Sequence, residues 1–466
     1  MSDIFEYIEK NKDKTFAEQK LTEVDNVIFS RLSYLELNDY VGKTLKEIAE
    51  VYKFTDKDDN KIFAKTTIKT EELLEAVAKT NRFQNVIILD LKEIASVDYA
   101  TAFFGCVFRI TDDISFVSFR GTDDKIMSFY EDAELAYSFP IPSQIAALHY
   151  VRYVTEKFED DFYIGGHSKG GNLALFAYVF LEDNLKDRII KVYNNDGPGF
   201  PDELAKILIT PDIVTKLETI VPECSIVGRM LETGNDFKII KSDAIGASQH
   251  NIFTWNVVDD SFEKAEKFSL LSELVEDTLT ESLVNVSSDD IKNAAQTIYK
   301  IAVKCGIEST DDINISNIKS IFSSLIEISK AEKDGSSDIS LIIKTLTKSL
   351  FNSMDMEKII SYGLTDKLQN LKEAMGYNDF KDFITKNITD SKYIKELKET
   401  IDNLDSKEYK SIKDIKDNID FNDLKEYIDI EQIKNFFNFE KLKQNKSSEN
   451  DTDELLEEND ESNKIE

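Results

Sequence analysis

The chain has 466 residues, of which 41% are hydrophobic and 11% aromatic, and its formal net charge is −32. This length and apolar content predict two or more units with a sizeable core. Because so negative a chain repels polyphosphates and anionic membrane surfaces, we expect no nucleic-acid partner and no purely electrostatic membrane attachment.

The N-terminal stretch MSDIFEYIEKNKDKTF is charged from its third residue and lacks the apolar run of a signal peptide. No uncharged apolar run approaches the length of a membrane span. The chain contains three widely spaced cysteines, Cys106, Cys224 and Cys305. Their spacing fits neither a disulfide framework nor a metal site. We therefore expect a soluble, cytoplasmic protein with no transmembrane segment, metal or cofactor.

Proline and glycine are unevenly distributed along the chain. All six prolines lie between Pro140 and Pro222, and twelve of the sixteen glycines lie at or before Gly246. Both residues favour turns and interrupt helices, so their loss indicates a change of architecture. We predict an α/β domain over residues 1–262, followed by a helical region of unknown role over 263–446.

Within the first region, apolar strand-like runs alternate with helix-like runs, as in a mostly parallel sheet covered on both faces. Asp112 and Asp113 lie near the junction of two early runs, which predicts a hairpin there. Strands are expected at 101–110, 113–122, 161–167 and 188–196, and helices at 26–42, 70–83, 142–158, 169–183 and 201–209.

Beyond residue 262 the chain is rich in Lys, Glu, Asp, Ile and Leu, with apolar residues three and four positions apart. This pattern is typical of amphipathic helices. The last twenty residues, 447–466, contain nine acidic residues and one lysine. Such a composition cannot build a core, so we predict an acidic disordered tail.

One motif carries chemistry. The stretch FYIGGHSKGGNLALFAYVF contains Gly166-His167-Ser168-Lys169-Gly170 between a strand-like and a helix-like run. This is the G-x-S-x-G nucleophile elbow, in which glycines two residues either side of the serine let strand and helix approach. The alternative is a structural glycine turn with an inert serine. The context favours Ser168 as a nucleophile.

A nucleophilic serine needs a general base, and the chain has three histidines. His167 adjoins the serine and points elsewhere, and His149 precedes the elbow in a helix-like stretch. His250 follows the elbow near the end of the α/β region, as the order serine, acid, histidine of this fold requires. We therefore predict His250 as the base.

The acid is less determined. Asp196 in VYNNDGPGF directly follows an apolar strand and would orient His250, although aspartate before glycine also commonly caps a turn. Asp236 and Glu223 are the alternative acids, since both also lie between the serine and the histidine.

An oxyanion needs two donors. One is the backbone N–H of Lys169, at the start of the helix after the elbow. The other is Thr122, after Gly121 in SFVSFRGTDD, although a plain strand-ending turn is nearly as good a reading of that segment.

The combination of FRGTDD, SFYEDAEL, GGHSKGGNLA and QHNIFTW resembles the class 3, fungal-type lipases and a related bacterial branch of α/β-hydrolase-like proteins. The resemblance covers about residues 24–258. It implies an α/β-hydrolase fold, oxyanion donors in FRGT and a supporting aspartate, here Asp132. One departure is that Ser225 in ECSIVGRML occupies the place of the class 3 acid, which favours Asp196 instead. Another is Lys169, whose charge suggests an anionic substrate head group.

The resulting hypothesis is a serine hydrolase that cleaves carboxylic esters, with acyl lipids or small esters as substrates. The competing hypothesis is a non-catalytic α/β-hydrolase-like scaffold whose helical region binds a protein partner.

Overall fold

The computed structural model describes residues 2–55, 64–96, 101–123, 125–244 and 246–269, together with seven further residues between 272 and 302. The predicted helical region, 263–446, lies largely outside these residues, and the predicted acidic tail, 447–466, lies wholly outside them. Both therefore remain predictions, as does the boundary at residue 262.

A seven-stranded sheet forms the centre of the described structure, and its strands follow one another in chain order. The strands β1 to β3 pair antiparallel, and β3 to β7 pair parallel. The strands are β1 (Ile87–Ser96), β2 (Thr101–Arg109), β3 (Ile114–Phe119), β4 (Asp161–His167), β5 (Ile189–Asn195), β6 (Leu217–Pro222) and β7 (Phe237–Ile240). A separate short hairpin joins β8 (Val257–Val258) to β9 (Ser261–Phe262).

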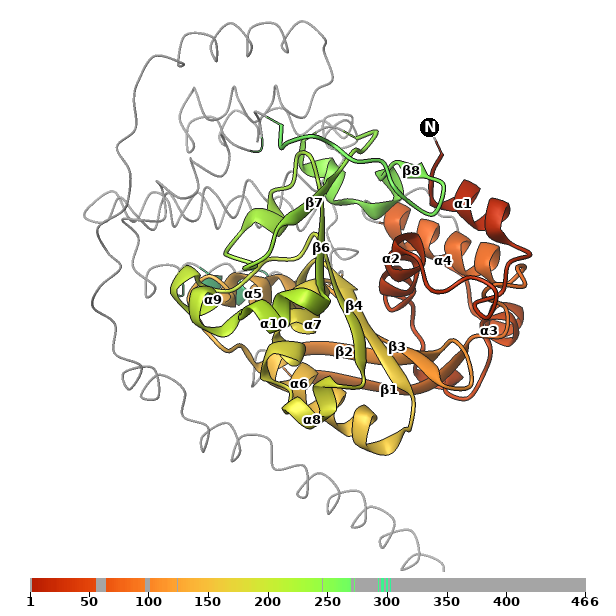
Figure 1. Ribbon diagram of the computed structural model, residues 1–466, viewed down its shortest axis with the longest axis horizontal. Helices are drawn as coiled ribbons and strands as arrows, with labels where there is room; N and C mark the ends of the chain where they lie inside the picture. The colour runs from red at the N-terminus through yellow and green to blue at the C-terminus, as the bar shows by residue number, and fades with distance from the viewer. Residues whose placement is uncertain are drawn as a thin grey trace, which may run out of the picture. The chain divides into compact units, whose positions relative to one another are not determined.

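Helices lie on both sides of this sheet (Figure 1). Those on one side precede the sheet in the chain and are α1 (Ile4–Asn11), α2 (Glu23–Leu32), the 3-10 turn η1 (Asn38–Tyr40), α3 (Leu45–Val51) and α4 (Ala64–Val77). Those after β3 are α5 (Ile126–Glu134), α6 (Pro142–Lys157), α7 (Lys169–Phe180), α8 (Asp183–Lys186), α9 (Asp202–Leu208) and α10 (Pro211–Lys216). Three further 3-10 turns are η2 (Val227–Arg229), η3 (Gly246–His250) and η4 (Ile252–Thr254).

The central strand β4 is covered on both faces. A side chain added at Gly165 would meet Asn26 of α2, whereas one added at Gly166 would meet Gly170 of α7. Neighbouring residues of a strand point to opposite faces, so α2 and α7 sandwich β4. This double burial explains why the strand reads as a continuous apolar run.

The predicted fold class, α/β with a mostly parallel sheet, is confirmed. The predicted hairpin appears as β2 and β3, and the predicted strands at 161–167 and 188–196 appear as β4 and β5. The single helix expected over 26–42 is wrong. Instead, α2 begins at Glu23 after a capping box formed by Thr22 and Asp25, and it ends at Leu32.

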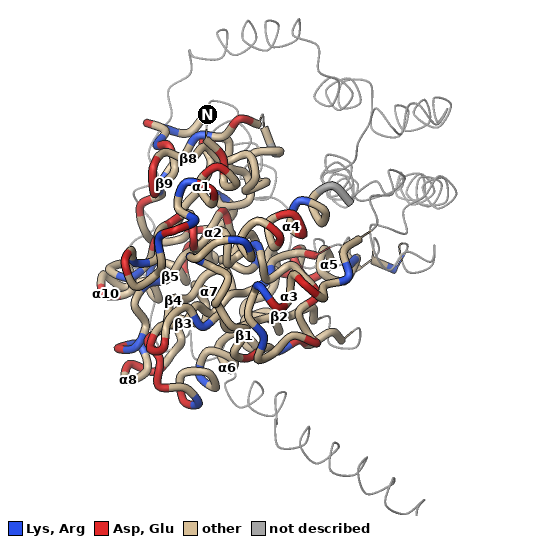
Figure 2. Tube along the Cα trace, turned by 90° about the vertical axis from the view of Figure 1, so that its right-hand side faces the viewer, with Lys and Arg blue, Asp and Glu red and all other residues tan. Residues whose placement is uncertain are grey.

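The described part of the chain gives little indication of a membrane span or a metal centre. No described helix is both long and apolar enough to cross a membrane. Within the same residues, His, Cys, Asp and Glu side chains form no group of three or more suited to hold a metal ion. Basic and acidic positions are interspersed along the traced elements (Figure 2).

Candidate active site

Ser168 lies on a strained turn between β4 and α7. Its φ of 58° and ψ of −133° are unusual for a residue with a side chain. A Cβ on Gly166 would lie 2.3 Å from the carbonyl carbon of Gly170, so a larger residue cannot occupy this position. The geometry is that of a nucleophile elbow, and the serine stands where the positive end of α7 begins.

The register of the sheet brings Ser168 beside the end of the next strand. His167 of β4 pairs with Asn195 of β5, and the Ser168 N–H donates to the Asn195 carbonyl oxygen at 3.0 Å. Asp196 follows immediately, with a positive φ of 51°. Carboxyl ends of parallel strands meet at one sheet edge, so the serine and this aspartate become neighbours.

His250 is held by Asp196. Its Nδ1 lies 2.6 Å from Asp196 Oδ2, and the aspartate side chain is fully buried while that of His250 remains 30% exposed. Because the carboxylate accepts a hydrogen bond from the Nδ1–H group, Nε2 of the neutral ring is left with its lone pair. A general base requires this tautomer.

The other oxygen of Asp196 is also hydrogen-bonded. Ser225 Oγ donates to Asp196 Oδ1 at 2.5 Å, and the Gly228 N–H donates to the same atom at 3.1 Å. Ser225 therefore contacts the carboxylate from the position that the acid occupies in class 3 lipases. Three donors in all fix this carboxylate, including His250.

The alternative acids are placed differently. Asp236 is exposed, and its backbone carbonyl oxygen accepts a hydrogen bond from Asn235 Nδ2 at 3.2 Å. Glu223 is bonded through its backbone N–H and C=O to Ile240 and Ser269. Of the three candidate carboxylates, Asp196 is the one hydrogen-bonded to His250.

His167 lies next to His250. Its Nε2 donates to the His250 carbonyl oxygen at 2.8 Å, and the two rings lie 4.4 Å apart between centroids. Burial, and then the neighbouring His250, hold the pKa of His167 well below its ordinary value. His167 is therefore neutral and supports the backbone of His250. His149 lies within α6, away from these contacts.

The FRGT segment passes close to the serine. A Cβ on Gly121 would lie 2.4 Å from the His167 carbonyl oxygen and 3.2 Å from Ser168 Cβ. The Thr122 hydroxyl donates to Asp132, the aspartate that the lipase resemblance singled out. Neither the Thr122 nor the Lys169 N–H has a hydrogen-bond acceptor among the described residues. Both donors are therefore available to an oxyanion.

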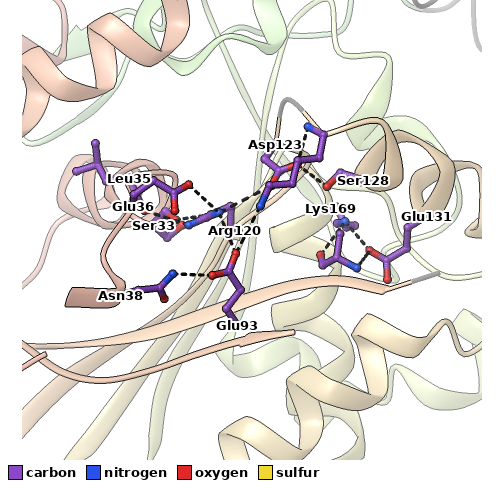
Figure 3. A network of polar contacts seen from close by, with 12 residues as sticks. Ser33, Leu35, Glu36, Asn38, Glu93, Arg120, Asp123, Ser128, Glu131 and Lys169 are labelled. Atoms are coloured by element: carbon purple, nitrogen blue, oxygen red, sulfur yellow. Dashed lines mark hydrogen bonds and ion pairs between the residues drawn. The ribbon is translucent and has the colours of Figure 1, made fainter. Parts of the chain in front are cut away.

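Arg120, the arginine of the FRGT segment, connects this segment to the chain after α2. Its Nε and Nη2 donate to the carbonyl oxygens of Ser33 and Leu35, at 2.8 and 3.0 Å. Figure 3 shows this guanidinium between the chain after α2 and the carboxylates of Glu93 and Asp123. The oxyanion segment is thereby fastened to the turn that follows α2.

The side chain of Lys169 does not face a substrate. Its Nζ lies 2.7 Å from Glu131 Oε2, and the two side chains are 1% and 0% exposed (Figure 3). Although burial disfavours the charge, the Glu131 and Asp132 carboxylates raise the pKa of Lys169. The expectation that Lys169 selects an anionic head group is therefore wrong, because its charge is already neutralised by α5.

Asp132 has an unusual environment. Its side chain is 34% exposed, yet Oδ1 is buried without a hydrogen bond to any described residue. Burial raises its pKa to about 6, against the opposing effects of Lys169 and Thr122. A group beside the oxyanion segment thus titrates just below neutral pH.

Ser168 Oγ has no hydrogen-bond partner among the described residues. Catalytic hydrogen bonds are often long or absent before substrate binds, so the missing bond does not argue against His250 as the base for Ser168.

Sequence reasoning missed Glu131 and the supporting role of Ser225. A lysine inside an elbow was the one available signal that a buried partner carboxylate must exist.

Comparison with known proteins was made against family models, curated proteins and solved structures. The Mbeg1-like family model matches residues 77–300, a stretch that includes Ser168, Asp196 and His250. Among the curated proteins no relative was found.

Two solved structures are similar. One is titled "Crystal structure of M37 lipase", with 15% identity and a TM-score of 0.27, over 43% of this chain and 67% of that chain. The other is a fungal lipase–inhibitor complex, with 17% identity and a TM-score of 0.26, over 43% of this chain and 70% of that chain. The expected relationship to a lipase-like family is supported by the match to the Mbeg1-like family model.

Proposed function

We propose that this chain, which is related to the lipase-like α/β-hydrolases, is a serine hydrolase that cleaves carboxylic esters, with acyl lipids as the favoured class. One observation carries the proposal, namely the hydrogen bond from His250 Nδ1 to Asp196 Oδ2 beside the elbow that bears Ser168. A structural turn with an inert serine does not require a histidine oriented by a carboxylate, so this pair favours a catalytic role for Ser168.

In the proposed reaction, Ser168 Oγ attacks the ester carbonyl while its proton moves to His250 Nε2. The developing oxyanion accepts hydrogen bonds from the N–H groups of Lys169 and Thr122. The C–O bond to the alcohol then breaks as His250 returns the proton to the leaving oxygen. Water, activated by the same histidine, releases the carboxylic acid and restores the serine.

Asp196 is assigned a positioning and electrostatic role. It keeps the proton on Nδ1 and stabilises the imidazolium that forms during each proton transfer. Ser225 and Gly228 donate hydrogen bonds to the carboxylate and fix its orientation.

The experiment is the hydrolysis of neutral chromogenic esters of increasing acyl length by the full chain, with Ser168→Ala as its control. The proposal expects turnover that the control loses, with a preference for medium or long acyl groups. Equal rates for the two proteins would contradict it and would favour a non-catalytic scaffold.

A further inference from the structure

Three arginines are buried in the described part of the chain, and two of them have carboxylate partners. Arg82 forms an ion pair with Asp25, and Arg120 lies 3.8 to 3.9 Å from three carboxylates. Arg31 is only 8% exposed, yet it pairs with no carboxylate among the described residues. A buried charge without a counter-ion is costly, so Arg31 requires an explanation other than stability.

The hydrogen bonds of Arg31 leave part of its guanidinium free. Nε donates to Thr70 Oγ1 at 2.8 Å, and Nη2 donates weakly to the Thr66 carbonyl oxygen at 3.4 Å. Both acceptors lie on α4, which runs beside α2 (Figure 2). Nη1 forms no hydrogen bond with a described residue. One edge of the guanidinium therefore has no hydrogen-bond acceptor among those residues.

A second cation, Lys69, lies near the same aromatic ring as Arg31. Arg31 Cζ lies 4.1 Å from the centre of the Tyr34 ring and 5.8 Å from that of Phe253. Lys69 Nζ lies 5.6 Å from the same Phe253 ring. Lys69 is exposed and forms no ion pair with a described residue. In a chain with a net charge of −32, two neighbouring cations without carboxylates are unexpected.

This cationic pair adjoins the catalytic residues. The Tyr34 hydroxyl donates to the His167 carbonyl oxygen at 3.3 Å, one residue before the elbow serine. Phe253 follows His250 by three positions, in η4. The histidine delivers its proton to the leaving alcohol, so groups around it lie on the alcohol side of the ester.

We infer that Arg31, assisted by Lys69, forms a subsite that binds a phosphate or carboxylate group carried by the alcohol part of the ester substrate. The inference rests on the proposed function and narrows its substrate class to anionic acyl esters. The planar guanidinium offers paired N–H donors that match either group. Burial lowers the pKa of Arg31 to about 10, so it remains charged at neutral pH.

The test compares two esters that differ only in the phosphate, 1-hexanoylglycerol 3-phosphate and 1-hexanoylglycerol. We expect Arg31→Met to lower the phosphate-to-neutral ratio of kcat/KM by roughly ten- to hundredfold, as for a lost hydrogen bond to a charged group. Lys69→Met should lower it only a few-fold, because an exposed cation is screened. Arg152→Met, which removes a surface guanidinium paired with Glu182, should leave the ratio unchanged.

A ratio unchanged by Arg31→Met would overturn the subsite, including the case in which both esters lose activity equally. Folding is checked by the melting temperature. Methionine keeps the apolar stem over Tyr34 and removes an uncompensated charge, so we expect a melting temperature no lower than that of the wild type.

Binding without turnover separates the subsite from the proposed function. Glycerol 3-phosphate should raise the melting temperature of the wild type and of Ser168→Ala, but not of Arg31→Met, and glycerol should raise none of them. If inorganic phosphate raises the melting temperature as much as glycerol 3-phosphate does, the anion alone is the recognised group. If inorganic phosphate raises it less, the phosphate is recognised together with the alcohol that carries it. Both results support the subsite. If no ester is cleaved, the proposed function fails. Separately, if no ligand gives a rise in melting temperature that depends on Arg31, the subsite is overturned.

Discussion

His250 Nδ1 lies 2.6 Å from Asp196 Oδ2, although 54 residues separate them in the chain. The sheet brings this about, because β5 ends at Asn195 beside the end of β4, and η3 returns the chain to that edge. Asp196 and His250, which are distant in the sequence, thus form one oriented hydrogen-bonded pair.

The first prediction concerns this pair. Asp196→Asn keeps the shape of the side chain but favours the wrong tautomer of His250, so kcat should fall by about 10,000-fold, as in other serine triads. The measurement is steady-state hydrolysis of a neutral ester. Asp236→Asn is the matched control, since Asp236 is exposed, and it should retain wild-type activity. A larger loss with Asp236→Asn would reassign the acid.

The second prediction concerns Ser225, which donates to Asp196 Oδ1 at 2.5 Å. Ser225→Ala leaves the carboxylate with the Gly228 N–H and His250, and it should lower kcat by about tenfold or more, as for a hydrogen bond to a charged group. KM should change little, because Ser225 contacts the acid and not the substrate. A change confined to KM would contradict a positioning role.

The third prediction concerns the buried pair of Lys169 and Glu131. Glu131→Leu alone, or Lys169→Met alone, leaves one buried charge without its partner and should destabilise the fold by about 3–5 kcal/mol. The double variant Lys169→Met with Glu131→Leu should regain much of that loss, because no charge remains buried. Urea denaturation gives the three free energies of unfolding. Additive losses in the double variant would show that the two side chains do not act as a pair.

The fourth prediction concerns pH. The folded pKa of Asp132, about 6, lies above its ordinary value of 3.8. Between these values the folded state holds a proton that the unfolded state has released, so this residue's contribution to stability is lost as pH rises from about 4 to 6. Melting temperatures of the wild type should therefore fall relative to Asp132→Asn over that range. A constant difference between the two proteins across the range would refute the raised pKa.

Much of this arrangement could be predicted from the sequence. The glycines around Ser168 impose the turn through sterics alone, and the alternation of apolar runs and helices specified the sheet that carries it. The proposed base could be chosen from the sequence because, of the three histidines, only His250 follows the elbow. The ends of the sheet were harder. The expected strands do not include β1, β6 or β7, and the four-residue β7 depends on pairing with β6.

Other features could not be predicted because they depend on contacts distant in sequence. The pairing of Lys169 with Glu131 spans 38 residues, and that of Ser225 with Asp196 spans 29. No local sequence pattern predicts which carboxylate will pair with a buried lysine. For the same reason, the sequence suggested that Lys169 would face an anionic substrate, whereas Arg31 is the buried cation that pairs with no carboxylate among the described residues.

The central claim is that Ser168 is a nucleophile activated by His250. It is tested most directly by treating the full chain with a fluorophosphonate probe and locating the adduct by mass spectrometry of its peptides. The account predicts one adduct on Ser168 in the wild type and none in Ser168→Ala, with much slower labelling of His250→Ala. A folded wild-type protein that takes up no probe, or one labelled at another residue, would contradict it.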